Sequence, residues 1–365
     1  MPTVQDITRY LETIAPRSYQ ESYDNAGLIT GNPATEVTGI LVSLDAIESV
    51  VDEAVAQECN MIVSHHPIVF RGLKSLTGKN YVERTVINAI KHDIALYAIH
   101  TNLDNVYQGV NRKISEQLGL QHLRVLAPKA DTLHKLVTFV PLANTDEVLR
   151  ALGEAGAGQI GNYKNCSFRT PGTGTFQPNE RATPHIGEAG KQEQVEEERI
   201  EVLYPAHLSS SVLAALRAAH PYEEVAYYQQ SLINENQEVG SGMIGDLAEP
   251  LPGPEFLRYL KEKMQLTVVR HTRLLDTPVR RVALCGGAGS FLLPHALRQR
   301  ADAFVTADYK YHEFFDADGQ LVIADIGHYE SEVCTKELIG ELLSKKFVNF
   351  AVHLSEITTN PVFYA

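Results

Sequence analysis

Three short segments of the sequence place histidine or carboxylate side chains directly after an apolar, strand-like run. They are MIVSHHP with His65 and His66, IALYAIHTNLD with His100 and Asp104, and LVIADIGHYESE with His328 and Glu332. Imidazole is a favoured ligand of zinc and other first-row metals, and carboxylates suit harder ions. Because ligands of open α/β sheets bind outside the carboxyl ends of strands, the three segments together predict one shared crevice.

The spacing of these residues favours two metal ions over one. His328 and Glu332 are four residues apart, so both lie on one face if the first turn is helical. His65 and His66 are adjacent, and successive side chains of an extended segment point to opposite sides. A dinuclear centre, with ions about 3.5–4 Å apart, would give each histidine its own ion. Asp104 or Glu332 would then bridge or cap the pair.

Three further stretches carry reactive or polar side chains. VTADYKYHE holds Asp308 and His312 four residues apart, which indicates an acid/base pair near the same sheet edge. The loop in VALCGGAGS could cradle a phosphate with its amides or let a substrate approach the backbone. HPYEEVAYY offers His220 and two glutamates, but the run reads as the entry to a strand and stays outside the predicted metal site. A single strand-end histidine is more often structural than a ligand, so the metal prediction depends on the convergence of three segments.

Composition limits the classes of protein to consider. The chain has 365 residues, of which 44% are hydrophobic and 21% charged, and this is typical of a soluble globular protein of about two domains. The net charge of −13 argues against binding to nucleic acid or to an anionic membrane. No signal peptide and no apolar stretch of about 20 residues is evident. The four cysteines are scattered, which favours the reducing cytoplasm.

The order of the elements predicts an α/β protein with an insertion. Short apolar runs alternate with helix-period segments in the first and last thirds, which indicates a sheet covered by helices in two similar halves, a three-layer α/β core. Residues 130–235 instead form two strand-helix units around a Gly/Thr/Pro-rich middle, as in a ferredoxin-like α+β module. The charged run KQEQVEEER in this part is interpreted as a solvated strand edge or loop. We therefore expect core halves at 1–129 and 236–365, with an inserted domain at 130–235.

Several of these motifs together resemble a known family. SHHP, HTNLD, VALCGGAGS, VTADYKYHE, GHYESE and YDNAGLITG resemble the GTP cyclohydrolase 1 type 2 homologue family, also called Nif-three-like. The middle segment, with GQIGNYKNCSF and HPYEE, resembles the PII-like or CutA-like module of its longer bacterial members. Members commonly have Trp-Asp-Asn near the start, whereas this chain has Tyr23 and no tryptophan.

The resemblance implies a dinuclear centre and an assembly. It implies metal ligands at His65, His66, Asp104, His328 and Glu332, and second-shell or acid/base roles for His100, Asp308 and His312. It also implies a toroidal homohexamer, built as a trimer of dimers, and two divalent ions per chain, with zinc or iron ahead of manganese.

Two functions follow as expectations. The first is a metal-dependent hydrolase, GTP cyclohydrolase-like, that acts on a nucleotide or phosphoester and uses His100 or His312 to transfer the proton. The alternative is a non-catalytic hexamer for metal storage, metal delivery or sensing. Family membership does not decide between them.

Overall fold

The computed structural model describes residues 1–365, and the chain divides into two compact units. The main unit consists of Met1–Pro128 and Gln237–Ala365, and the insert is Lys129–Asn236. No helix in the structure has both the length and the apolar character needed to cross a membrane.

The first sheet of the main unit has five strands, most of them parallel. They are β1 (Gly27–Thr30), β2 (Ile40–Ser43), β3 (Met61–Ser64), β4 (Ala95–Ala98) and β15 (Val352–Leu354). Their order is β1-β4-β3-β2-β15, with β1 antiparallel to β4 and the other pairs parallel. Every residue of β2, β3 and β4 is buried, as expected for parallel strands covered on both faces.

The second sheet has six strands and repeats the parallel centre of the first. They are β5 (Gln121–Lys129), β10 (Asn236–Leu251), β11 (Arg270–His271), β12 (Val279–Ala288), β13 (Ala303–Ala307) and β14 (Val322–Asp325). Their order is β11-β14-β13-β12-β10-β5. The triplet β12-β13-β14 is parallel and ends in the antiparallel edge strand β11, just as β2-β3-β4 ends in β1.

Helices cover both faces of each sheet. The helices of the main unit are α1 (Val4–Ile14), α2 (Glu48–Ala56), α3 (Tyr81–Lys91), α4 (Thr101–Asp104), α5 (Val110–Gln117), α8 (Gly253–Lys263), α9 (Leu293–Arg298), α10 (His328–Glu332) and α11 (Thr335–Lys346). Alternate residues of one strand face different clusters: Leu41 packs with α2 and α3, whereas Ile40 and Val42 pack with α1. Each half is therefore a three-layer arrangement. One short helix follows the third parallel strand in each half, α4 after β4 and α10 after β14.

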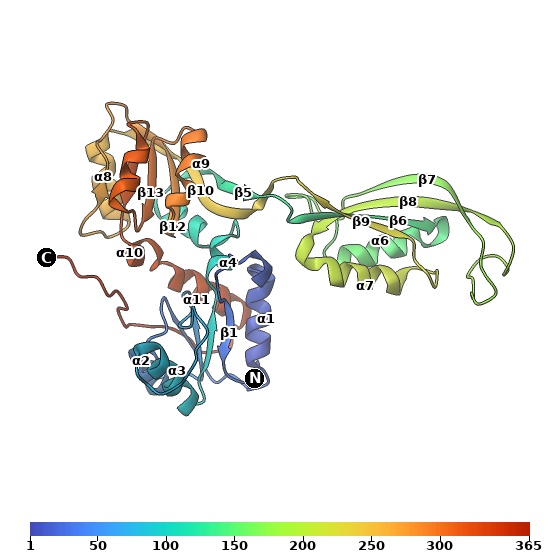
Figure 1. The fold of residues 1–365 in the computed structure, drawn as a ribbon, viewed down its shortest axis with the longest axis horizontal. Coiled ribbons are helices and arrows are strands. Elements are labelled where there is room, and N and C mark those ends of the chain that lie inside the picture. The colour runs from blue at the N-terminus through green and yellow to red at the C-terminus, as the bar shows by residue number, and fades with distance from the viewer. The chain divides into compact units, whose positions relative to one another are not determined.

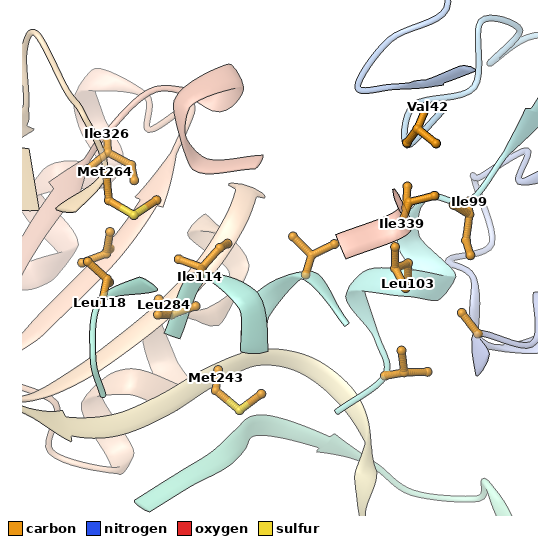
Figure 2. Packing of buried hydrophobic residues seen from close by; sticks show 14 of the residues in the cluster. Val42, Ile99, Leu103, Ile114, Leu118, Met243, Met264, Leu284, Ile326 and Ile339 are labelled. Atoms are coloured by element: carbon orange, nitrogen blue, oxygen red, sulfur yellow. The ribbon is translucent and has the colours of Figure 1, made fainter. Parts of the chain in front are cut away.

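A continuous hydrophobic cluster joins the two halves of the main unit. Ile99 and Leu103 from the first half lie in the same cluster as Ile114, Leu284 and Ile326 (Figure 2). All five side chains are almost completely buried. The elements that carry the candidate ligands thus rest on one shared core, which holds them in fixed positions.

The insert contains a four-stranded antiparallel sheet and two helices. Its elements are β6 (Leu133–Pro141), α6 (Thr145–Glu154), β7 (Ser167–Phe176), β8 (Glu193–Pro205), α7 (Ser209–Ala219) and β9 (Tyr227–Leu232). The strand order is β7-β8-β6-β9, and both helices pack on one face (Figure 1). This βαββαβ order is ferredoxin-like. The charged run KQEQVEEER begins two residues before β8. Residues 193–196 pair with β7 alone, so the interpretation as a strand edge holds for them, whereas residues 197–199 pair with both β6 and β7.

The predicted fold class is confirmed. The main unit is an α/β structure of two similar halves, and an α+β domain is inserted between β5 and β10.

Candidate metal centre

Three strand ends in the main unit bring the predicted ligands together. His65 and His66 follow β3 directly, and their backbone amides extend the ladder to Ser43 and Leu44 at 3.2 and 2.9 Å. His100 and Asp104 lie at the two ends of α4, after β4. His328 and Glu332 are the first and last residues of α10, after β14. The ligand atoms of these residues form three overlapping groups, and within each group the atoms lie within 4.8 Å of one another. The groups are His65–Asp104–Glu332, His66–His328–Glu332 and His65–His66–His100.

Glu332 lies between two sets of side chains. Its Oε2 atom is 3.0 Å from Nε2 of His66 and 3.0 Å from Nε2 of His328. Its Oε1 atom is 3.9 Å from Nε2 of His65, and that nitrogen is 3.6 Å from Oδ1 of Asp104. Each carboxylate oxygen therefore faces a different set of ligand atoms.

Two buried polar atoms in the centre have no hydrogen-bond partner. They are Nε2 of His65, in a side chain with no solvent exposure, and Oδ1 of Asp104. A buried polar atom without a partner is costly, and both atoms point at the group that includes Glu332. A metal ion would satisfy both atoms, so the donor set fits a metal.

Each histidine is oriented by an acceptor at its Nδ1 atom. Nδ1 of His65 contacts the carbonyl oxygen of Ile99 at 2.9 Å. The other three contacts are to carboxylates: His66 to Asp45 at 2.7 Å, His100 to Asp24 at 2.8 Å and His328 to Asp308 at 2.7 Å. An acceptor at Nδ1 fixes the ring and directs Nε2 toward a metal, which is the usual arrangement around ligating histidines.

Two of these orienting carboxylates were missed by reasoning from the sequence. Asp45 ends the strand-like run GILVSLD, and Asp24 lies in YDNAG. The position of Asp45 at a strand end was a usable signal, whereas nothing local links Asp24 to His100, 76 residues away. Asp24 also accepts a hydrogen bond from the backbone amide of Thr101. Asp45 accepts a hydrogen bond from the hydroxyl of Thr359 in the C-terminal segment.

The electrostatics of the cluster depend on its buried carboxylates. Burial lowers the pKa of His65 to about 3, so this ring stays neutral and able to bind a metal. Burial acts in the same direction on His66, but hydrogen bonds to Asp45 and Glu332 outweigh it and raise the pKa to about 10. Burial raises the pKa of Asp104 well above its usual value, and the nearby charge of Glu332 adds to this. Two carboxylates this close repel each other, so one of them keeps a proton unless a cation lies between them.

The two glycines at the end of β12 support the carboxylate of Glu332. The amide of Gly286 donates to Oδ1 of Asn111, and that of Gly287 donates to Oγ of Ser331, both at 2.9 Å. A Cβ atom on Gly287 would lie 2.5 Å from Oε1 of Glu332, and Gly287 has a φ of +60°. Glycine is needed here because any side chain would displace Glu332.

His312 is not brought to the cluster within one chain. It lies in the 3₁₀ segment Tyr311–Ala317, where its ring contacts Tyr311 and Phe315, and it does not line the cavity. The predicted pairing of Asp308 with His312 is replaced by the contact of Asp308 with His328. A proton-transfer role for His312 stays a prediction without support from this chain.

The cluster opens into a cavity of about 760 Å³, a size common for small-ligand sites. Aromatic side chains, among them Phe70, Phe291 and Tyr329, line it together with the polar residues of the cluster. Arg270 is the one lysine or arginine in the lining, and it pairs with Asp325 at 3.1 Å.

Known proteins match the chain over nearly its whole length. The family model described as Duf34/NIF3 (NGG1p interacting factor 3) matches residues 2–361. The protein called GTP cyclohydrolase 1 type 2 homolog from Halalkalibacterium halodurans is 41% identical over 98% of this chain and 97% of its own, and its namesake from Bacillus subtilis is 39% identical over the same shares.

Solved structures agree. A Bacillus cereus protein related to NIF3 superposes with a TM-score of 0.88 at 38% identity, covering 100% of this chain and 99% of its own. A Staphylococcus aureus protein superposes with a TM-score of 0.79 at 30% identity over the same shares. With a site in which histidine and carboxylate groups can hold metal, and with relatives matched from end to end, the chain belongs to the Duf34/NIF3 family.

Proposed function

We propose that this protein holds two divalent metal ions that share Glu332. His65 and Asp104 would hold one ion with Oε1, and His66 and His328 would hold the other with Oε2. The single observation that carries the proposal is that the two oxygens of Glu332 face different ligand sets at 3.0–3.9 Å. His100 lies close to His65 and His66 and lines the same cavity.

The ligand types favour zinc or iron, with manganese next. Imidazole suits zinc and iron, and three or four histidines meet two carboxylates here. No cysteine belongs to the three groups, and all four cysteines are free. Free thiols are in keeping with the cytoplasmic location that is part of this proposal.

The activity proposed for this centre is hydrolysis of a nucleotide or phosphoester. Two ions in such a site supply Lewis-acid polarisation and activate water near neutral pH. His100 is the group to accept a proton, because Asp24 holds its Nδ1 atom and leaves Nε2 facing the cluster. The aromatic rings of Phe70 and Phe291 can hold a flat ring, and Arg270 can meet a phosphate. The name of the relatives, GTP cyclohydrolase 1 type 2 homolog, points to the same substrate class.

A second function is favoured by the charge of the cavity. The lining contains seven carboxylates and one arginine; besides Asp104 and Glu332 the carboxylates are Glu21, Asp45, Asp308, Asp325 and Glu330. Such a lining attracts metal cations and repels polyanions. It supports metal storage, delivery or sensing without turnover.

A hexamer, built as a trimer of dimers, completes the proposal. Tyr311 and Phe315 of the main unit are 71% and 67% exposed, and their ring centroids lie 5.7 Å apart. Large apolar side chains exposed near one another mark surfaces that other chains cover. Light scattering on purified protein would test the assembly, and a monomer or a lone dimer would contradict it.

The first experiment is metal content per chain by plasma mass spectrometry, on untagged protein purified without chelator or added metal. The proposal expects about two ions per chain and a clear decrease in His66→Ala. His312→Ala is the matched control, because it removes an imidazole outside the cluster and should keep both ions. A chain that binds no stoichiometric metal after reconstitution with zinc, iron or manganese would refute the site.

Turnover then separates the two functions. Hydrolysis of GTP and of simple phosphoesters is measured with the metal found above. A hydrolase loses activity in Glu332→Ala and in His65→Ala, and His100→Ala retains metal but lowers the maximal rate. A storage or delivery protein shows no turnover and releases its ions to an acceptor chelator.

A further inference from the structure

The insert contains a hollow on the sheet face that its helices do not cover. Ile200 and Val202 of β8 pack against α6 and α7, so Glu197 and Arg199, at the alternate positions, face the other way. On that face a cavity of about 620 Å³ lies over β6, β7 and β8 and is walled by residues 177–186 and 222–224. This volume is typical of small-ligand sites.

Two glycines of β7 form the floor of the hollow. Gly172 pairs with Glu197 in the ladder, and a Cβ atom on Gly172 would meet no atom within 4 Å. A Cβ atom on Gly174 would lie 2.1 Å from Oε2 of Glu197. The missing side chains therefore create the space and give the Glu197 carboxylate room to lie across the strand.

Glu197 is a buried carboxylate without a cation. The residue is 7% exposed, and its Oε1 atom accepts one hydrogen bond, from the hydroxyl of Tyr222 at 2.8 Å. Burial raises the pKa of Tyr222, and the charge of Glu197 raises it further, so the phenol keeps the proton that it donates. Oε2 accepts no hydrogen bond from the protein, and no Lys, Arg or His nitrogen lies within 4.0 Å of it. Two basic residues also line the hollow, but Arg199 pairs with Glu201 at 2.8 Å and His185 contacts the ring of Tyr222. Oε2 is therefore an anionic acceptor that a cation in the hollow can use.

Aromatic rings stand around this carboxylate. Phe139 and Tyr228 meet edge to face with ring centroids 5.9 Å apart, and Phe176 and Tyr222 do so at 5.8 Å. All four rings line the hollow. Ring faces attract cations, and the attraction grows when water is excluded. Two more carboxylates, Glu223 and Glu224, add negative charge to the rim, although Glu223 also accepts the amide of Thr183.

We propose that the hollow of the insert binds a small organic cation, a primary or methylated ammonium group on an apolar or aromatic body. The ammonium group pairs with Oε2 of Glu197, and the body lies over Gly172 against Phe139 and Phe176. The HPYEE segment thereby gains a role as a ligand wall through Tyr222. This site is separate from the metal centre, and neither proposal depends on the other.

The test is calorimetric titration of the full-length protein with phenethylamine and with benzyltrimethylammonium. At least one cation is expected to bind saturably with a Kd below about 1 mM. Phenethyl alcohol, the uncharged isostere of phenethylamine, should bind at least tenfold more weakly. Equal binding of the alcohol and the amines, or no saturable binding of either cation, would overturn the proposal.

Three variants test whether ligand binding needs the charge of Glu197 and the open space over Gly172. Glu197→Gln keeps the shape and the acceptor for Tyr222 but removes the charge, so binding should weaken about tenfold or more. Gly172→Leu places a side chain in the hollow, at a position where a Cβ atom meets no atom within 4 Å, and should abolish binding. Glu196→Gln is the matched control, because it removes the neighbouring exposed charge outside the hollow and should leave binding unchanged. Equal Kd values for wild type and Glu197→Gln would reject the assignment, and circular dichroism checks that each variant is folded.

Discussion

The Nε2 atom of His66 lies 3.0 Å from the Oε2 atom of Glu332, although 266 residues separate the two in the sequence. His66 follows a strand of the first half of the main unit, and Glu332 ends the short helix after the last parallel strand of the second half. The pair therefore joins the two halves of the main unit at their strand ends. Glu332 contacts histidines from both halves.

Replacing Glu332 with glutamine should remove most of the bound metal. The amide has one oxygen and no charge, so it cannot offer an anionic ligand to both groups. We expect metal content to decrease from about two ions per chain to fewer than one, measured by plasma mass spectrometry. Glu330→Gln is the control, since Glu330 lies in the same helix but contacts Asn360 instead of the histidines. Retention of two ions in Glu332→Gln would contradict the shared position of this carboxylate.

Replacing Asp45 with asparagine should weaken metal binding without removing a ligand. Asp45 holds Nδ1 of His66 at 2.7 Å, and loss of its charge makes the imidazole less basic. We expect metal affinity to fall about 10- to 100-fold in a competition titration with a chelator. Thr359→Val removes only the hydroxyl that donates to Asp45, so its effect should be smaller. A larger loss of metal affinity in Thr359→Val than in Asp45→Asn would contradict the role of Asp45 in orienting His66.

Gly287→Ala should disturb the metal centre through Glu332. The added Cβ atom would lie 2.5 Å from Oε1, so the carboxylate must move. Gly319→Ala is a matched control, because Gly319 has a similar φ of +67° but open space around its Cβ position. Both variants carry backbone strain of about 1–2 kcal/mol, visible as a lower free energy of unfolding in urea. Only Gly287→Ala should also lose metal, and equal metal content in the two variants would rule out the contact.

The stability of chelator-treated protein should fall at alkaline pH. Burial lowers the pKa of both His66 and His328, but contacts with Glu332 and with Asp45 or Asp308 outweigh it and raise them to about 10 and about 9. Because these values exceed the ordinary 6.5, the stabilisation is complete below about pH 6.5 and is lost as pH rises through 9 to 10. Urea unfolding from pH 6 to 10 measures it.

Metal affinity should show the opposite trend. Ions compete with protons for His66 and His328, so affinity increases as pH rises through neutrality. His65 adds little to this dependence, because its pKa of about 3 leaves it neutral throughout. A flat pH profile for both stability and affinity would show that these histidines do not titrate with the centre.

Much of the fold followed from periodicity in the sequence. The runs ILVS, MIVS and VIAD are buried strands, as predicted, because fully covered parallel strands are apolar at every position. The helix-period segment after GHYESE is α11, and α10 ends before it at Glu332. The long strands β5 and β10 were not predicted, because their pairing joins residues more than 100 positions apart.

Strand-end position was a good signal for the residues of the cluster but not for their surroundings. His65, His66, His100, Asp104, His328 and Glu332 do meet, because carboxyl ends of parallel strands share an edge. The same four-residue spacing relates Asp308 to His312, but it did not bring His312 to the cluster. His312 lies in a 3₁₀ helix on the surface. The burial of Glu197 also escaped sequence reasoning, because a run of charges gives no sign of which position a loop will cover.

The division of the ligands between the two halves bears on how the protein is made. His65, His66, His100 and Asp104 are synthesised before the insert, whereas His328 and Glu332 follow it. A growing chain that has just completed the insert therefore displays three histidines and one aspartate without the carboxylate that faces both groups. If the protein binds metal as proposed, tight loading has to wait until the second half docks, and a bound ion would then report that the main unit has finished folding.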